Sequence, residues 1–183
     1  MAALAPGARG AALRTLSGLS RRAPGRSLLS LQALFARLAR AEDARGALEI
    51  EERIWDVWMS DANAHAERAL DLATTDIAAE RYDIAETRLA RLVGARPDFA
   101  EAWHKLGVLY FVLGRDSEGL AALRGSLERE PRHFAALGAI GEILAAAGER
   151  EGAGLAYRAA LRLHPHMREA RARLEKILRG AAR

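Results

Sequence analysis

Three of the chain's five prolines lie 34 residues apart, and two pairs of glycines keep the same step. The positions are Pro97, Pro131, Pro165, Gly107, Gly141, Gly114 and Gly148. A fixed period of this length is typical of repeat proteins, in which one helical hairpin recurs and buries its apolar face against its neighbours. The period therefore predicts an array of helical hairpins.

When each repeat is taken to end just after its proline, the repeats span residues 66–99, 100–133 and 134–167. The middle repeat carries a W-x2-L-G-x2-Y motif that begins at Trp103 and ends at Tyr110. This motif and its closing proline resemble the tetratricopeptide repeat. The resemblance covers all three repeats, and the first departs most from the pattern. It has Asp76 at a position where an aromatic residue or leucine is expected.

The resemblance to the tetratricopeptide repeat family implies an all-α fold. Tandem antiparallel helix hairpins would stack as a short right-handed solenoid over residues 63–167, and a capping helix at 168–180 would follow. Glycine in a helix costs about 1 kcal/mol relative to alanine, so Gly107 and Gly141 are expected to have a packing role. Without a side chain, each would let a partner helix approach closely. Gly114 and Gly148 are expected to end the first helix of their hairpins.

Residues 27–62 are predicted to form a divergent N-terminal hairpin that covers the open end of the first repeat. Apolar residues recur there at helical spacing, and Asp43 is a plausible N-cap for the second helix. Trp55 and Trp58 lie three residues apart on that helix. Such a pair favours a core role, because aromatic residues dominate buried contacts, and a ligand-stacking site is the alternative.

The N-terminal segment 1–26 differs from the rest of the chain in charge. Residues 1–41 contain seven arginines and no acidic residue, whereas the formal net charge of the whole chain is +4. The segment is expected to be disordered or a targeting segment. The compartment therefore stays open: cytoplasmic by default, or mitochondrial or exported if 1–26 is an address. The remainder is mildly acidic, so no nucleic-acid-binding face is expected on the folded part.

Composition limits the chemistry that the chain can perform. It contains no cysteine, which excludes disulfides and thiolate sites, and no apolar run reaches the ~20 residues of a membrane span. His164 and His166 could chelate a metal, but no further ligand lies at useful spacing, and His133 is expected to be a solvated turn residue. No catalytic constellation stands out. We therefore expect no enzyme activity, no cofactor and no metal site.

The predicted function is that of a non-catalytic protein-interaction scaffold of unknown oligomeric state. The resemblance implies a concave groove, lined by the first helix of each repeat, that binds a peptide or helix of a partner. The predicted groove residues are Ile77, Glu101, His104, Lys105, Val108, Phe111, Val112, Glu142 and Ala145. Phe111 is expected to be a groove anchor, because exposed aromatic residues beside small ones are typical of binding hot spots, and an inter-repeat contact is the alternative. The alternative function is a scaffold whose basic N-terminal arm targets it to an organelle, an anionic membrane or nucleic acid.

Overall fold

A computed structural model describes residues 30–181 of the chain. This part of the chain forms nine α-helices and no strand, which confirms the predicted all-α class. The helices are α2 (Leu31–Leu38), α3 (Ala44–Met59), α4 (Ala64–Ala78), α5 (Tyr82–Ala95), α6 (Ala100–Val112), α7 (Asp116–Arg129), α8 (Phe134–Ala146), α9 (Arg150–Leu163) and α10 (Arg168–Ala181). The basic segment 1–26 and the roles predicted for it lie outside the described residues.

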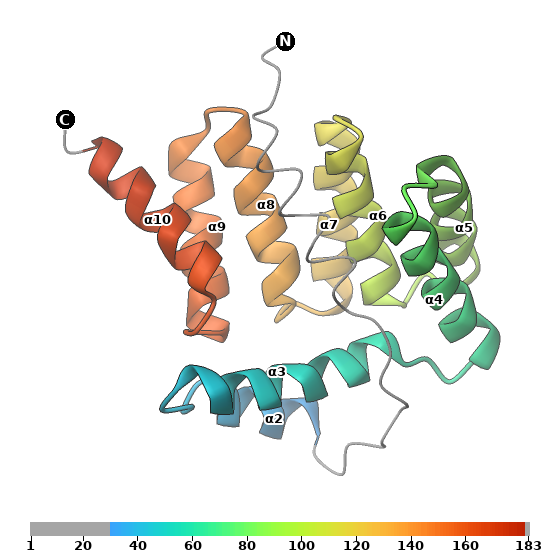
Figure 1. Cartoon of the computed structure of the whole chain (residues 1–183), viewed down its shortest axis with the longest axis horizontal. Helices are drawn as coiled ribbons and strands as arrows, with labels where there is room; N and C mark the ends of the chain where they lie inside the picture. Colours follow the sequence, from blue (N-terminus) through green and yellow to red (C-terminus); the bar gives the residue numbers. More distant parts are fainter. Residues whose placement is uncertain (1–29, 182–183) are drawn as a thin grey trace.

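Helices α4 to α9 stand side by side as three antiparallel hairpins, and α10 packs against α9 at the end of the array (Figure 1). Within each hairpin the two helices contact each other extensively, and the second helix contacts the first helix of the next hairpin. At the far end, Ala170 of α10 packs on Ala153 and Tyr157 of α9. The stacked-hairpin architecture with a terminal capping helix is thus confirmed.

The turn inside each hairpin uses the same left-handed backbone position. Gly114 and Gly148 have φ of 78° and 85°, as expected for glycine residues that end a helix. The equivalent position in the first hairpin, 34 residues before Gly114, is Glu80, with φ of 58°. A side chain there costs about 1 kcal/mol relative to glycine, so the first turn is the most strained of the three.

The irregular residue of the first repeat, Asp76, is explained by two arginines. Its buried carboxylate accepts hydrogen bonds from Arg81 at 2.7 Å and from Arg88 at 3.1 Å. Burial raises the pKa of Asp76, but these hydrogen bonds and charges outweigh it and lower the pKa below the usual value. In the second repeat the equivalent pair is Tyr110 and Arg115, whose guanidinium lies 4.4 Å from the ring centroid. The first repeat thus has an ion pair at the position where the second has a cation–π contact.

Glycine in the first helices allows close helix packing, as the sequence predicts. A methyl group added at Gly107 would lie 2.7 Å from Leu123 Cγ and 3.0 Å from the carbonyl oxygen of Gly119. Side chains essentially never approach this closely, so α6 and α7 can reach their observed separation only without a Cβ at this position.

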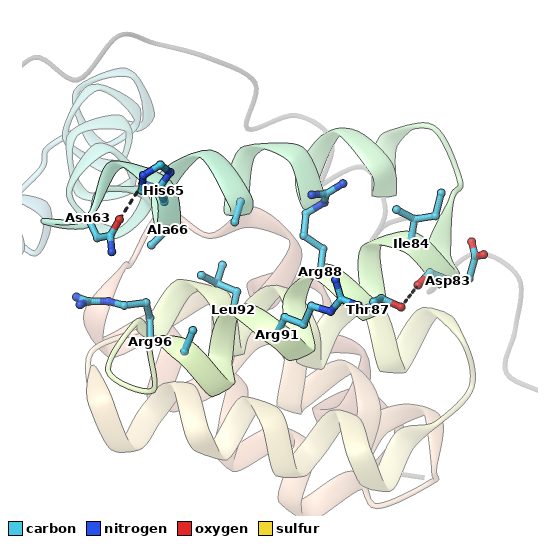
Figure 2. Close-up of a pocket in the computed structure, with 12 residues that line it drawn as sticks. Asn63, His65, Ala66, Asp83, Ile84, Thr87, Arg88, Arg91, Leu92 and Arg96 are labelled. Carbon is cyan, nitrogen blue, oxygen red and sulfur yellow. Dashed lines mark hydrogen bonds between the residues drawn. The ribbon is translucent and has the colours of Figure 1, made fainter.

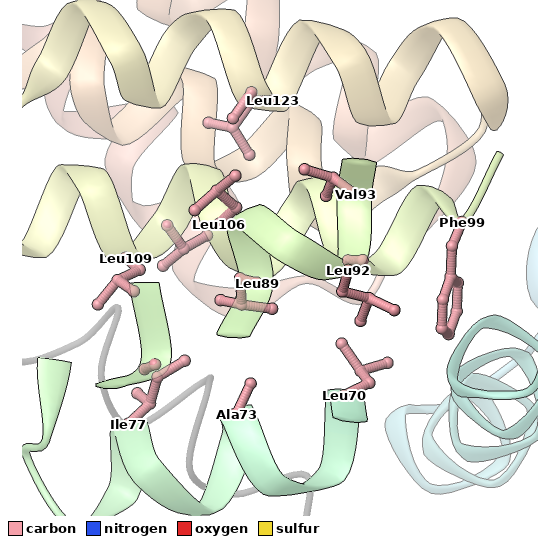
Figure 3. Close-up of a cluster of buried hydrophobic side chains, with 14 of the residues drawn as sticks. Leu70, Ala73, Ile77, Leu89, Leu92, Val93, Phe99, Leu106, Leu109 and Leu123 are labelled. Atoms are coloured by element: carbon pink, nitrogen blue, oxygen red, sulfur yellow. The ribbon is translucent and has the colours of Figure 1, made fainter. Parts of the chain in front are cut away.

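The main core runs between the hairpins. Figure 3 shows leucines of α5 and α6 facing the apolar side of α4, with Leu123 of α7 beyond them. The cluster continues along α6 through Val108 and Phe111 to Ile143 of α8. Because one continuous cluster links the first helices of the three repeats, the array is held together by packing between neighbours.

The N-terminal hairpin α2–α3 lies in a different place from the one predicted. Asp43 caps α3 as expected, since its Oδ1 accepts a hydrogen bond from the Gly46 N–H at 2.7 Å. The hairpin does not cover the open end of the first repeat, however. It lies across the turns between repeats, along the ends of α6 to α9 (Figure 1), and packs on Phe134 and Leu163.

Candidate functional site

The contact between the N-terminal hairpin and the array is aromatic and carries histidines; we call it the hairpin–array junction. Trp55 and Trp58 of α3 are 7% and 6% exposed, so they occupy core positions. The Trp58 ring stacks on His133, with centroids 4.0 Å apart and planes at 12°, and Phe134 lies beside it at 5.0 Å. His133 is fully buried, which corrects the expectation of a solvated turn residue.

Beneath these rings lies a buried polar cluster centred on Glu101, which is itself fully buried. One carboxylate oxygen lies 2.9 Å from His133 Nε2, and the other lies 3.2 Å from His104 Nδ1. Lys105 Nζ lies 3.4 Å from the second oxygen and has no hydrogen-bond partner in the described structure. The cluster thus joins α6 to the turn before α8.

The electrostatics of the cluster favour an ionised Glu101 and a neutral His133. Burial raises the pKa of Glu101, but the charges of His104 and Lys105 and two hydrogen bonds from the histidines hold it well below its usual range. Burial, reinforced by the electrostatic effect of the neighbouring His104 ring, lowers the pKa of His133 to about 4. One carboxylate therefore pairs with both histidines by hydrogen bonds and with Lys105 by charge.

Glu101, His104 and His133 form a possible metal-ligand set, because their ligand atoms lie within 4.8 Å of one another. Two features disfavour a metal there. The Ala136 N–H donates to His133 Nδ1 at 3.2 Å, so His133 carries its proton on Nε2 and offers no lone pair toward Glu101. The Lys105 ammonium would also repel a cation. The geometry suits a structural polar cluster that fixes α6, α8 and the hairpin.

Two further histidines bind the hairpin to the last turn of the array. His164 Nε2 lies 2.9 Å from a carboxylate oxygen of Glu51, and His166 Nε2 donates to the Ala41 carbonyl oxygen at 2.9 Å. His164 and His166, which were considered as a metal chelate, therefore make two separate contacts with the N-terminal hairpin. Nothing in the local sequence could reveal this, because the partners are 113 and 125 residues away.

Most of the predicted groove residues are inaccessible. Six are buried: Ile77, Glu101, His104, Lys105, Val108 and Phe111. Val112 and Glu142 are partly buried, and Ala145 is exposed. Glu142 accepts from the Tyr157 hydroxyl at 2.8 Å and pairs with Arg173 at 3.1 Å. Phe111 is 1% exposed and lies in the main core, a location that favours its inter-repeat role over a groove anchor.

An open cleft lies between α4 and α5, at the end of the array that the hairpin leaves uncovered (Figure 2). Its volume is about 610 Å³. Small and apolar side chains form its floor, including Ala66, Ala69 and Leu92, and Ile84 is 43% exposed at one end. The sequence did not indicate this cleft, because the hairpin was expected to cover the end of the array where it lies.

Arginines of α5 and the turn after it line the cleft. Arg88 bonds to Asp76, and Arg96 bonds to a carboxylate oxygen of Asp61 at 3.0 Å, so internal partners hold both side chains. Arg91 is exposed and forms no ion pair with the residues that the structure describes. The cleft therefore combines an apolar floor with a cationic edge.

No helix between residues 30 and 181 is long and apolar enough to cross a membrane.

Comparisons with known proteins agree with the repeat architecture. A family model described as tetratricopeptide repeat matches residues 70–129 and 114–168. A TPR repeat-containing protein of Rhizobium etli is 28% identical over 147 residues, which cover 80% of this chain and 72% of the relative. A solved structure of a MamA mutant has a TM-score of 0.50 and 26% identity, covering 73% of this chain and 93% of that chain.

Proposed function

Because the chain belongs to the tetratricopeptide repeat family, we propose that it acts as a non-catalytic scaffold that binds a segment of a partner protein in the α4–α5 cleft. Arrays of this kind provide extended surfaces for protein–protein interaction. The proposed binding site differs from the predicted concave groove, because most of the residues predicted to line that groove are not exposed.

The observation that carries the proposal is the accessibility of the cleft. Binding needs a surface that a partner can reach, and six of the nine residues predicted to line the concave groove are buried. The α4–α5 cleft is open: its deepest residues, Ala66 and Leu92, are buried, but Ala69, Ile84 and the polar groups at its edge can be reached. Exposed apolar surface rimmed by polar residues is typical of protein-interaction sites.

The buried polar cluster at the hairpin–array junction supports a non-catalytic role. Its carboxylate and histidines are nearly or fully buried, so no substrate reaches them without displacement of the hairpin. Their hydrogen bonds are directed at one another and at the backbone of α8. Groups that act on a substrate must lie within hydrogen-bond reach of it, and these do not face the cleft.

Capture of partners from the source cell with matched variants tests the proposal. Ile84→Glu puts a carboxylate at the end of the cleft, at a side chain that is 43% exposed, so the fold should tolerate it. Leu155→Glu, at a side chain on α9 that is 58% exposed, is the matched control. We expect quantitative mass spectrometry to show a partner that the wild type and Leu155→Glu retain and Ile84→Glu loses.

A partner retained equally by Ile84→Glu would contradict the location of the site. In that case Val112→Glu examines the concave face, because Val112 is one of the three predicted groove residues that are not fully buried. Thermal unfolding of each variant shows whether a loss of binding follows from a loss of folding.

A further inference from the structure

The α4–α5 cleft lies where a preceding helix would continue the array. Inside the array, the second helix of each hairpin is covered by the next element: α6 covers α5, α8 covers α7, and α10 covers α9. The leading face of the first hairpin has no such neighbour among the described residues, because α2–α3 packs across the turns instead. An additional helix could therefore extend the stack at this end.

The floor of the cleft is suited to an amphipathic helix. Ala66 and Ala69 are three residues apart on α4, and their small side chains allow a neighbouring backbone to approach. Leu92 of α5 lies opposite, and Ile84 provides an exposed apolar contact farther along the same helix (Figure 2). Ala66 and Leu92 are already buried, so a helix with an apolar stripe would cover chiefly Ala69 and Ile84.

The charge at the edge of the cleft indicates which polar side chains a partner helix should carry beside its apolar stripe. Three guanidinium groups and one carboxylate, that of Asp83, line the cleft. Arg88 and Arg96 are 34% and 39% exposed, so each can accept a second anionic partner in addition to its internal one. Arginine presents a planar set of donors that matches a carboxylate, which makes acidic side chains the best complement.

A second copy of this chain would supply a poor occupant. Helix α10, at the opposite end of the array, carries five basic and two acidic residues, so head-to-tail stacking would bring arginines against arginines. The acidic helix α3 already buries its apolar face in the hairpin–array junction. Since neither helix offers the complementary chemistry, a different protein is the better candidate for the occupant.

We propose that the α4–α5 cleft binds an acidic amphipathic helix of a partner protein, which extends the array by one helix. This inference rests on the proposed function and adds the chemical class of the partner. The apolar stripe of the partner covers Ala69 and Ile84, and its carboxylates bind Arg91 and its neighbours.

A displayed library of amphipathic helices is the probe. Leucine is fixed at i, i+3, i+4 and i+7, and the other positions vary among Glu, Gln and Lys. The library is selected on the full chain and counter-selected on Ile84→Glu, so that only cleft binders are retained. We expect glutamate to be enriched, and binding to weaken as salt increases, because exposed ion pairs are screened.

The selected helices are then measured against Arg91→Glu and against Arg158→Glu, an exposed arginine on α9 outside the cleft. Arg91→Glu should weaken binding by about tenfold or more, the effect of losing a charge-assisted hydrogen bond, and Arg158→Glu should not. A lysine-for-glutamate version of the helix should recover binding to Arg91→Glu.

The outcomes separate the two proposals. If no helix of any charge binds in a manner that depends on Ile84, the helical partner is refuted, whereas the proposed function fails only if the captured partner is also retained by Ile84→Glu. If neutral or basic helices bind the cleft as tightly as acidic ones, or Arg91→Glu has no effect, the proposed function stands and the acidic partner is refuted.

Discussion

Replacing Glu101 with glutamine should destabilise the protein far more than a change of one side-chain atom suggests. Glu101→Gln keeps the volume of the side chain, so no cavity is made, but it removes the negative charge of the buried cluster. The Lys105 ammonium, 3.4 Å away and fully buried, then has no counter-ion. The new amide NH₂ also faces histidine groups that donated to the carboxylate, so at least one donor loses its acceptor.

The size of the effect follows from the burial of the pair. Removing one partner of a buried ion pair typically costs 3–5 kcal/mol, because an uncompensated charge remains in the interior. For a protein of this length each kcal/mol lowers Tm by about 2–4 °C, so the expected decrease is about 6–20 °C. Replacing both partners by uncharged groups removes this penalty, so Glu101→Gln with Lys105→Met should recover most of the loss.

Urea and thermal unfolding, followed by circular dichroism and tryptophan fluorescence, measure these differences. Glu128→Gln is the matched control, because Glu128 pairs with Arg124 on the surface, where the side chains are 55% and 81% exposed. Such pairs contribute at most about 1 kcal/mol. A loss below about 1 kcal/mol for Glu101→Gln, or a double variant no more stable than the single one, would refute the reasoning.

Three other measurements test the described structure. Because burial lowers the pKa of His133 to about 4 from an unfolded value of about 6.5, its contribution to stability is complete above about pH 6.5 and is lost as the pH falls toward 4. Unfolding between about pH 7 and pH 5 should show this dependence, and His133→Asn, which keeps an acceptor for the α8 cap, should reduce it. Gly107→Ala should cost about 1–3 kcal/mol in urea unfolding because the methyl group meets Leu123, whereas Gly94→Ala, with no atom within 4 Å, should be neutral or slightly stabilising. Phe111→Glu should unfold or strongly destabilise the chain, since it puts a carboxylate in the core; an unchanged Tm would instead support the groove-anchor role.

The repeat period was enough to predict the array, because each repeat depends on contacts that are local in sequence. Gly107 illustrates this, since the residues that require it to be a glycine lie on the next helix, within 16 residues. The structural role of Asp76 was harder to predict from the sequence. Only the structure shows that Arg81 and Arg88 compensate for the missing aromatic residue, although both are close in sequence.

The candidate site was harder to predict, because it depends on where the N-terminal hairpin packs. The amphipathic pattern of α3 shows that Trp55 and Trp58 are buried but does not identify the surface that buries them. The location is decided by contacts such as His164 with Glu51, which no local periodicity reports. With the hairpin assigned to the wrong end, the sequence could reveal neither the buried cluster around Glu101 nor the open α4–α5 cleft.

The position of the hairpin has a consequence for the order in which the chain can fold during synthesis. Ala41 and Glu51 leave the ribosome early, whereas His166 and His164, to which they bind, are made 125 and 113 residues later. The aromatic face of the hairpin can meet His133 and Phe134 once the last repeat begins to emerge, but Glu51 and Ala41 remain without His164 and His166 until that repeat has been translated. Folding of the array can begin from any repeat, but its closure against the hairpin waits for residues near the C-terminal end.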